Sequence, residues 1–297
     1  MTGPERGFLL LTSRLGNPER KVLTTAQLRT LGQRIKNAPA PTENRELEAR
    51  DLIALGYGAE MAERILTLLS EEDLLDHYLR WGEKAGCVPL TRVSPGYPSE
   101  LLDKLGMEAP GCLWAKGDLS LQNFRKISLV GSRDLNPLNA EFAAEVGRQA
   151  ALQGYTLVSG NARGADKTGQ NAALDAGGKV ISIVADELSK HSNRENVLYL
   201  SEDCFDEPFS AQRALSRNRC IHALGEKTLV AQSSYQHGGT WDGTVKNLRF
   251  GWSPVFCFDD GSPAAQLLCQ MGANPVTRQQ LSDLEALQGC EDNFLGR

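Results

Sequence analysis

From residue 127 onward the sequence alternates short apolar segments with amphipathic helical patterns. The apolar segments span 127–131, 156–160, 179–185, 227–233 and 254–258, and the first four are rich in β-branched residues. Helical patterns lie between and after them, at 137–153, 165–177, 210–225, 239–251 and 262–273. Strands that alternate with helices pair in parallel, because each helix carries the chain back across the sheet. We therefore predict an α/β fold with a doubly wound, mainly parallel sheet.

The segment before this alternation has a different character. Residues 1–87 are polar with short helical patterns at 23–35, 44–56, 59–70 and 71–86, and predict a small helical N-terminal domain. Residues 88–126 are rich in turn residues and predict an irregular connector leading into the core. We expect the core at 127–275 and a short C-terminal tail at 276–297, with space for one short helix and no further domain.

Composition narrows the functional classes. The formal net charge of −5 argues against attraction of nucleic acid over the whole surface, but it allows a local basic channel. The apolar run 8–11 is too short for a signal peptide, and no run approaches the length of a membrane span. We expect a cytoplasmic protein without a membrane partner.

The seven cysteines contain no CxxC spacing, which predicts free thiols without a disulfide framework or zinc site.

Candidate binding residues follow the strands. In an open parallel sheet ligands gather at the carboxyl ends of the strands. The segments that follow the first, second and fourth predicted strands, 131–133, 159–169 and 233–244, are rich in glycine and small hydroxyl residues. Such turns let backbone N–H groups approach an anion, and helix N-termini favour negative charge there. The three turns predict an anion site at one edge of the sheet.

Cations accompany these turns. Arg133, Arg163 and Lys167 lie in the first two, and the acid-free stretch 208–220 adds the arginines Arg213, Arg217 and Arg219. Each feature alone has an ordinary explanation: an ion pair of Arg163 with Asp134 or Asp166, or a solvated arginine face on a helix. Their convergence at one sheet edge predicts a phosphate-rich ligand.

Enzyme constellations are sparse. The four histidines are isolated, none has metal-ligand spacing, and there is no GxSxG elbow. We interpret Asp166 as an acid near a helix N-terminus. Asp242 could serve as a catalytic carboxylate and His237 could touch a ligand, but we predict no catalytic residue and no metal.

Four stretches of the chain together resemble the DprA/Smf family of DNA-processing proteins. They are YPSELLDKLGMEAPGCLWAKGDLSL (97–121), ISLVGSR (127–133), LVSGNARGADKTGQNAALDAGGKVISIV (157–184) and LSRNRCIHALGEKTLVAQS (215–233). The resemblance spans about residues 95–275. It implies a Rossmann-like domain that binds single-stranded DNA, usually as a homodimer, and that hands strands to the recombinase RecA. It implies no metal and no nucleotide cofactor.

The resemblance places the family's phosphate pocket on three groups of residues: Gly131, Ser132 and Arg133; Ser159, Gly160, Arg163, Gly164 and Asp166; and Arg217, Asn218 and Arg219. With the cations and glycines found above, the full predicted DNA-binding set also includes Lys167, Arg213, Gly238, Gly239 and Thr240. Bases would stack on an aromatic side chain, for which Phe209, Tyr235 and Trp241 are candidates.

The chain departs from the family pattern at two loops and at its end. The stretches VADELSKHSNREN (184–196) and QHGGTWDGT (236–244) replace family motifs, and we expect no C-terminal winged-helix module of the kind that many members carry. Some divergent members neutralise a co-encoded toxin in phage defence, so a toxin is an alternative partner to RecA. A third alternative is a nucleotide phosphoribohydrolase, because HGGTWDGT resembles the GGxGT loop of those enzymes, with Asp242 assisting cleavage of an N-glycosidic bond.

Overall fold

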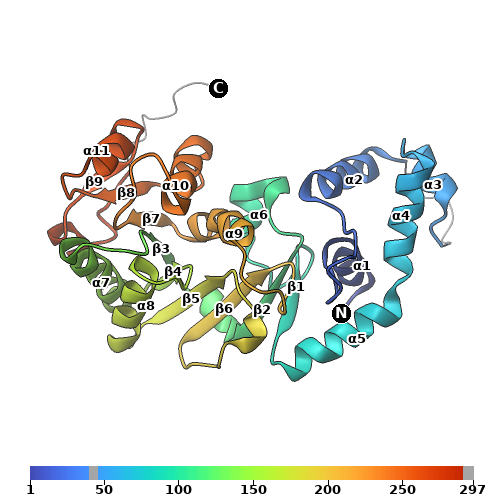
Figure 1. The fold of residues 1–297 in the computed structure, drawn as a ribbon, viewed down its shortest axis with the longest axis horizontal. Helices are drawn as coiled ribbons and strands as arrows, with labels where there is room; N and C mark the ends of the chain where they lie inside the picture. The colour runs from blue at the N-terminus through green and yellow to red at the C-terminus, as the bar shows by residue number, and fades with distance from the viewer. Residues whose placement is uncertain (40–45, 290–297) are drawn as a thin grey trace.

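The computed structural model describes residues 1–39 and 46–289. It contains one nine-stranded sheet with helices on both faces, and a helical module lies against one end of it (Figure 1). The strand order is β1-β2-β6-β5-β4-β3-β7-β8-β9. The predicted fold class, a doubly wound and mainly parallel α/β sheet preceded by helices, is confirmed.

Seven strands run parallel and form the body of the sheet. They are β3 (Lys126–Val130), β4 (Thr156–Ser159), β5 (Lys179–Val184), β6 (Val197–Glu202), β7 (Lys227–Val230), β8 (Val255–Phe258) and β9 (Asn274–Val276). The chain adds β4, β5 and β6 on one side of β3, and then returns to add β7, β8 and β9 on the other side. The direction of winding therefore reverses between β3 and β7, which opens a crevice at their carboxyl ends.

The helices between the strands cover two apolar layers. On one face lie α7 (Pro137–Leu152) and α8 (Ala165–Asp175), and on the other α6 (Ser99–Leu105), α9 (Ala211–Leu224), α10 (Gly239–Phe250) and α11 (Pro263–Gln270). Asn136 caps α7 as its sequence predicts, since its side chain accepts a hydrogen bond from the Asn139 amide at 2.9 Å. Burial of both layers fixes the strand ends that form the crevice.

The segment 88–126, predicted as an irregular connector, is more ordered than expected. It holds β1 (Val88–Thr91) and β2 (Cys112–Gly117), and β2 pairs antiparallel with both β1 and β6. The six-residue strand β6 and the three-residue strand β9 were also absent from the sequence prediction. Four short 3-10 turns complete the described elements. Two lie in the segment 88–126, η1 (Gly106–Glu108) and η2 (Leu119–Asn123), whereas η3 (Leu188–Lys190) lies between β5 and β6 and η4 (Gln279–Ser282) lies after β9.

Five helices form the N-terminal module in the part of it that the structure describes. They are α1 (Gly3–Thr12), α2 (Thr25–Asn37), α3 (Ala49–Ala54), α4 (Ala59–Ser70) and α5 (Glu72–Lys84). The sequence prediction missed α1, which begins with a capping box between Thr2 and Glu5. Most of the predicted break at 37–44 lies outside the described residues.

Aromatic packing joins this module to the sheet. Tyr78 of α5 stacks on Phe205 with ring centroids 4.6 Å apart and meets Trp114 of β2 edge-on at 5.3 Å. Such pairs are favourable beyond their buried area. The segment that follows β6 is therefore held directly by the helical module.

The cysteines behave as ordinary buried residues in the described ranges. Six of them are free thiols and five of these six are buried. Cys290 lies outside the described residues.

Candidate functional site

A cavity of about 520 Å3 opens at the crevice between β3 and β7. Its walls come from the turn after β3, one side of α9 and the turn that leads into α10. The structure brings these predicted residues together around it: Gly131, Ser132, Arg133, Asp166, Arg217, Asn218, Gly238, Gly239 and Thr240. We call this space the strand-end cavity.

Arg217 is the central cation of the strand-end cavity. It is only 7% exposed, and its Nε and Nη1 atoms have no hydrogen-bond partner. Burial lowers the pKa of its guanidinium, whereas the nearby Asp166 carboxylate raises it. A buried guanidinium with unpaired donors is costly, and an anion is the partner that removes this cost.

Gly160 makes the position of Arg217 possible. A Cβ atom added at residue 160 would lie 1.4 Å from Arg217 Nη1. The predicted glycine turn therefore makes room for an arginine side chain from another element, in addition to bringing backbone close to a ligand.

Asp166 is an internal brace of the turn after β4. Its Oδ2 atom accepts hydrogen bonds from the Gly160 amide at 3.1 Å and the Ala162 amide at 3.0 Å. Burial raises the pKa of this carboxyl, and the charge of Arg217 opposes that shift. Its carboxylate is thus used to shape the loop, close to the helix-terminal role that the sequence predicts.

Two further glycines in the loops around the cavity have positive φ angles. Gly164 has φ = +81°, and a Cβ there would lie 2.3 Å from the Ser132 carbonyl oxygen. Gly238, at φ = +88°, precedes α10, and no side chain caps this helix. Asn218 Nδ2 donates to the Gly239 carbonyl at 3.0 Å and so ties α9 to α10. The open N-terminus of α10 can therefore present N–H groups to an anion.

Arg133 and Phe209 lie at the outer rim. Arg133 is exposed, and its guanidinium carbon is 5.6 Å from the centroid of the Phe209 ring. This is a cation–π distance. Arg133 is thus free to contact a ligand at the cavity mouth.

Five of the predicted residues lie beside or beneath this cavity rather than on its lining. Ser159 is buried and accepts a hydrogen bond from Gln170 at 2.6 Å, and Lys167 is exposed on α8. Arg163 forms an exposed ion pair with Asp134 at 2.6 Å, which is the ordinary alternative that the sequence had left open. Gly160 makes room for the Arg217 side chain, and Gly164 allows the turn after β4 to approach the Ser132 carbonyl.

Arg213 and Arg219 of α9 are engaged elsewhere. Arg213 donates to the carbonyls of Glu207 and Pro208 at 2.7 and 3.1 Å. Arg219 pairs with the buried Glu202 at 3.1 Å. Both side chains therefore have protein partners, unlike Arg217.

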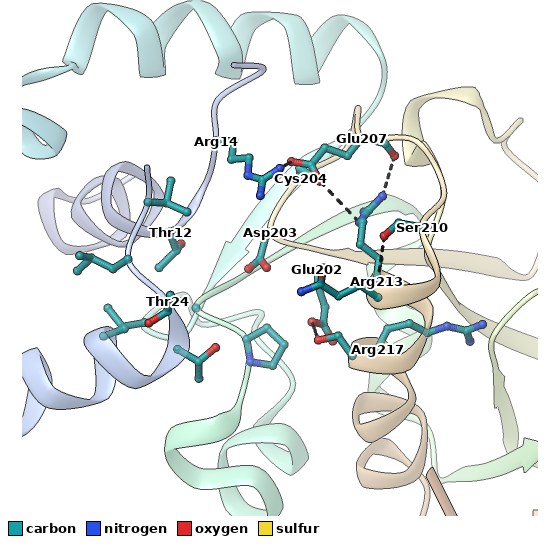
Figure 2. Close-up of a pocket in the computed structure, with 18 of the residues that line it drawn as sticks. Thr12, Arg14, Thr24, Glu202, Asp203, Cys204, Glu207, Ser210, Arg213 and Arg217 are labelled. Carbon is teal, nitrogen blue, oxygen red and sulfur yellow. Dashed lines mark hydrogen bonds and ion pairs between the residues drawn. The ribbon is translucent and has the colours of Figure 1, made fainter. Parts of the chain in front are cut away.

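These two arginines line a second cavity, of about 700 Å3, between the helical module and α9 (Figure 2). Arg14, from the segment between α1 and α2, lies 3.6 Å from Glu207 across it. Phe209 and Arg217 line both cavities, so the two spaces adjoin at the start of α9. Both acidic and basic side chains line this interdomain cavity, and several of them pair with each other. The cavity is therefore less suited to bind phosphate than the strand-end cavity, and its charges serve the contact between the helical module and the sheet domain.

Residues at the base of the strand-end cavity were not identified from the sequence. His222 is 1% exposed, and burial lowers its pKa to about 3. Its Nδ1 atom lies 3.1 Å from Asn247 Nδ2, which fits a neutral ring that accepts a hydrogen bond. His237 and Asp242 line the same cavity near its opening and are exposed. An isolated histidine on a helix gave no sequence signal for this placement.

Within residues 1–39 and 46–289 no group of three or more His, Cys, Asp or Glu side chains is arranged to hold a metal ion. In the same ranges no helix is long and apolar enough to cross a membrane.

Comparison with known proteins gives a consistent relationship. DprA of Streptococcus pneumoniae is 30% identical over 186 residues, which cover 58% of this chain and 66% of that protein. DprA of Bacillus subtilis is 28% identical over 184 residues, covering 57% and 62%. The chain thus spans less than two thirds of the length of these curated relatives.

Solved structures share the fold. The crystal structure of Streptococcus pneumoniae DprA matches with a TM-score of 0.73 at 24% identity, over 97% of this chain and 99% of that chain. DprA of Helicobacter pylori matches with a TM-score of 0.55 at 21% identity, over 66% and 94%.

The family assignment comes from the sheet-forming part of the chain. Residues 89–283 match the family described as DNA recombination-mediator protein A, and this range includes every strand from β2 to β9. The strand-end cavity lies within it. The chain is therefore a member of the DNA recombination-mediator protein A family, to which the DprA and Smf proteins belong.

Proposed function

We propose that this protein binds single-stranded DNA, without catalysing a reaction on it, by holding backbone phosphates in the strand-end cavity. The observation that carries this proposal is Arg217, a buried guanidinium with two unpartnered nitrogens beside a glycine turn. A phosphate would supply the missing acceptors and offset the burial of the charge.

The surroundings of Arg217 suit a chain of phosphates better than a single small anion. Arg133 lies at the mouth of the same cavity, and the uncapped N-terminus of α10 forms another wall. Arg217 would hold one phosphate at depth, while Arg133 and the α10 amides would contact its neighbours along the strand. Proteins that bind single strands combine such electrostatic contacts with stacking of bases on aromatic rings.

A relative with the same fold supports the choice of ligand. The Helicobacter pylori protein was solved in a study of its single-stranded DNA binding mode. We extend this ligand to the present chain on the strength of Arg217 and the cavity. A role in DNA uptake or recombination, a homodimer, and RecA or a co-encoded toxin as protein partner stay predictions.

A binding assay tests the proposal. Fluorescence anisotropy of a labelled oligothymidine of about 25 nucleotides would be measured at two salt concentrations with the wild type and with Arg217→Gln. Loss of a charged hydrogen bond to phosphate should weaken binding by about tenfold or more. The matched control is Arg125→Gln, because Arg125 precedes β3 at the opposite end of the strands and pairs with Glu226 and Glu285.

Two results would contradict the proposal: a wild type that does not bind the oligonucleotide, or an Arg217→Gln variant that binds as tightly as the wild type. The phosphoribohydrolase alternative has its own test. Hydrolysis of a nucleoside monophosphate that is abolished by Asp242→Asn would favour an enzyme.

A further inference from the structure

We propose that Phe209 is a stacking surface for a base of the bound strand, and that the helical N-terminal module holds it in place through residues 205–210. We call these residues the platform loop. This inference rests on the proposed function and gives the helical module a role in it.

Phe209 has the exposure and the position that a stacking surface needs. It is 53% exposed, and it lines the strand-end cavity that contains the unpartnered Arg217. Its ring already makes a cation–π contact with the planar guanidinium of Arg133. A base adjacent to a phosphate bound at Arg217 could cover the remaining ring surface, which would remove apolar area from water.

The other aromatic candidates are less well placed. Trp241 is 8% exposed and belongs to the core beneath α10. Tyr235 is exposed, but it is not among the residues that line the cavity, and its ring lies 6.2 Å from that of Trp241. Phe209 is therefore the best placed of the three.

Arg213 fixes the platform loop from the α9 side. Its Nη1 atom donates to the Glu207 and Pro208 carbonyls, the two residues that precede Phe209, and to the Ala185 carbonyl at 3.2 Å. The Ser210 hydroxyl, directly after Phe209, accepts from the Arg213 amide at 3.1 Å and caps α9. Figure 2 shows Arg213 beside Glu207 and Ser210 at the interdomain cavity. Arg213 is thus a positioning residue in this proposal.

The helical module holds the same loop from the other side. The Tyr78 hydroxyl donates to the Asp206 carboxylate, and Arg14 lies 3.6 Å from Glu207. Phe205 is fully buried among the rings of Tyr78, Trp81 and Trp114. Every residue from 205 to 207 therefore contacts the module or its aromatic junction with the sheet. A loop that is fixed at both ends loses little conformational freedom when a base stacks on it.

The test separates base contacts from phosphate contacts. Binding of an oligothymidine would be compared with binding of an abasic oligonucleotide of the same length, and the ratio of the two affinities measures the base contribution. Phe209→Ala should lower the affinity for oligothymidine about fivefold or more and leave the affinity for the abasic strand unchanged. Phe209→Trp should restore the ratio.

Phe250→Ala is the matched control. Phe250 is 58% exposed and has its own arginine, with Arg249 5.4 Å from the ring centroid, but it ends α10 and does not line the strand-end cavity. Its replacement should leave both affinities unchanged.

The role of the helical module is tested with Tyr78→Phe, which removes only the hydroxyl that bonds Asp206. This variant, and likewise Arg213→Lys, should lower the base contribution in the same direction as Phe209→Ala. Neither should lower it further when Phe209 is already alanine, because both act through that ring. Circular dichroism and denaturation of each variant would confirm that it is folded.

The outcomes distinguish this inference from the proposed function. An unchanged affinity ratio in Phe209→Ala would overturn the stacking surface, even if Arg217→Gln abolishes binding. Equal loss of both affinities in Tyr78→Phe would overturn the positioning role of the module. Failure of the wild type to bind either oligonucleotide would remove both proposals.

Discussion

Arg217 Nη1 occupies the space directly over Gly160, where a Cβ atom would be only 1.4 Å away. The turn after β4 and the middle of α9, which are far apart in the sequence, therefore pack against each other at this point. In this packing the Arg217 guanidinium is buried and has no hydrogen-bond partner at Nε and Nη1.

Replacement of Gly160 by alanine should displace Arg217 and weaken binding of single-stranded DNA by about tenfold or more, since a charged hydrogen bond is lost. Anisotropy with oligothymidine measures this. The control is Gly7→Ala, because Gly7 lies within α1 with no atom within 4 Å of its added Cβ. The control should bind normally. Normal binding by Gly160→Ala would show that Arg217 does not need its observed position.

Salt dependence should divide the arginines into two groups. The logarithm of the binding constant falls with the logarithm of salt concentration by about 0.7 for each phosphate neutralised on a single strand. Arg133→Gln and Arg217→Gln should each reduce this slope by about that amount. Arg219→Gln should leave the slope unchanged, because Arg219 pairs with Glu202. A reduced slope for Arg219→Gln would show that Arg219 contacts a phosphate of the bound strand.

The Arg219–Glu202 pair should instead contribute to folding. Glu202 is 8% exposed, so Arg219→Met leaves a buried carboxylate without its cation, and loss of one partner of a buried pair costs about 3 kcal/mol. Urea denaturation would show this as a lower free energy of unfolding. Adding Glu202→Gln should recover part of the loss. Equal stability of Arg219→Met and the wild type would mean that the pair is not important for folding.

His222 should make stability depend on pH on the acidic side. Burial lowers its pKa from 6.5 to about 3, so the unfolded chain takes up a proton first as the pH falls. The contribution of the neutral His222 ring to the free energy of unfolding is therefore complete above pH 6.5. It is lost as the pH falls toward 3, by about 1.4 kcal/mol per pH unit. Denaturation at several pH values should show this slope reduced in His222→Gln. The exposed His77, changed to Gln, serves as the control and should keep the wild-type slope.

Local patterns in the sequence were sufficient for most of the parallel sheet and its helices. The strands near 127, 156, 179, 227 and 254 are apolar on both sides because helices cover both faces, and such runs are visible without knowledge of the fold. The strands β1, β2 and β6 were not predicted. They pair with one another through contacts between distant segments, and their turn-rich or polar surroundings mask a periodic pattern.

The candidate site was predicted in part for a related reason. Glycine turns at strand ends are local features, and the structure does place Gly131, Gly238 and Gly239 around one cavity with Arg133 and Arg217. The different directions of Arg217 and Arg219 are also a local consequence, because side chains two positions apart on an α-helix point about 200° apart. One faces the cavity, and the other faces Glu202.

The sequence by itself determined the alternation of five parallel strands with helices, the glycines at the strand ends and the presence of arginines near them, since these depend on periodicity and backbone freedom within a few residues. Only the tertiary structure decided which arginine is left without partners. Arg213 donates to carbonyls of the platform loop and Arg219 pairs with Glu202, whereas Arg217 lies over Gly160 near Asp166 with no hydrogen-bond partner at Nε and Nη1. Each outcome depends on which distant segment packs against α9, and burial against that segment determines whether a charge is already paired or is open to a ligand.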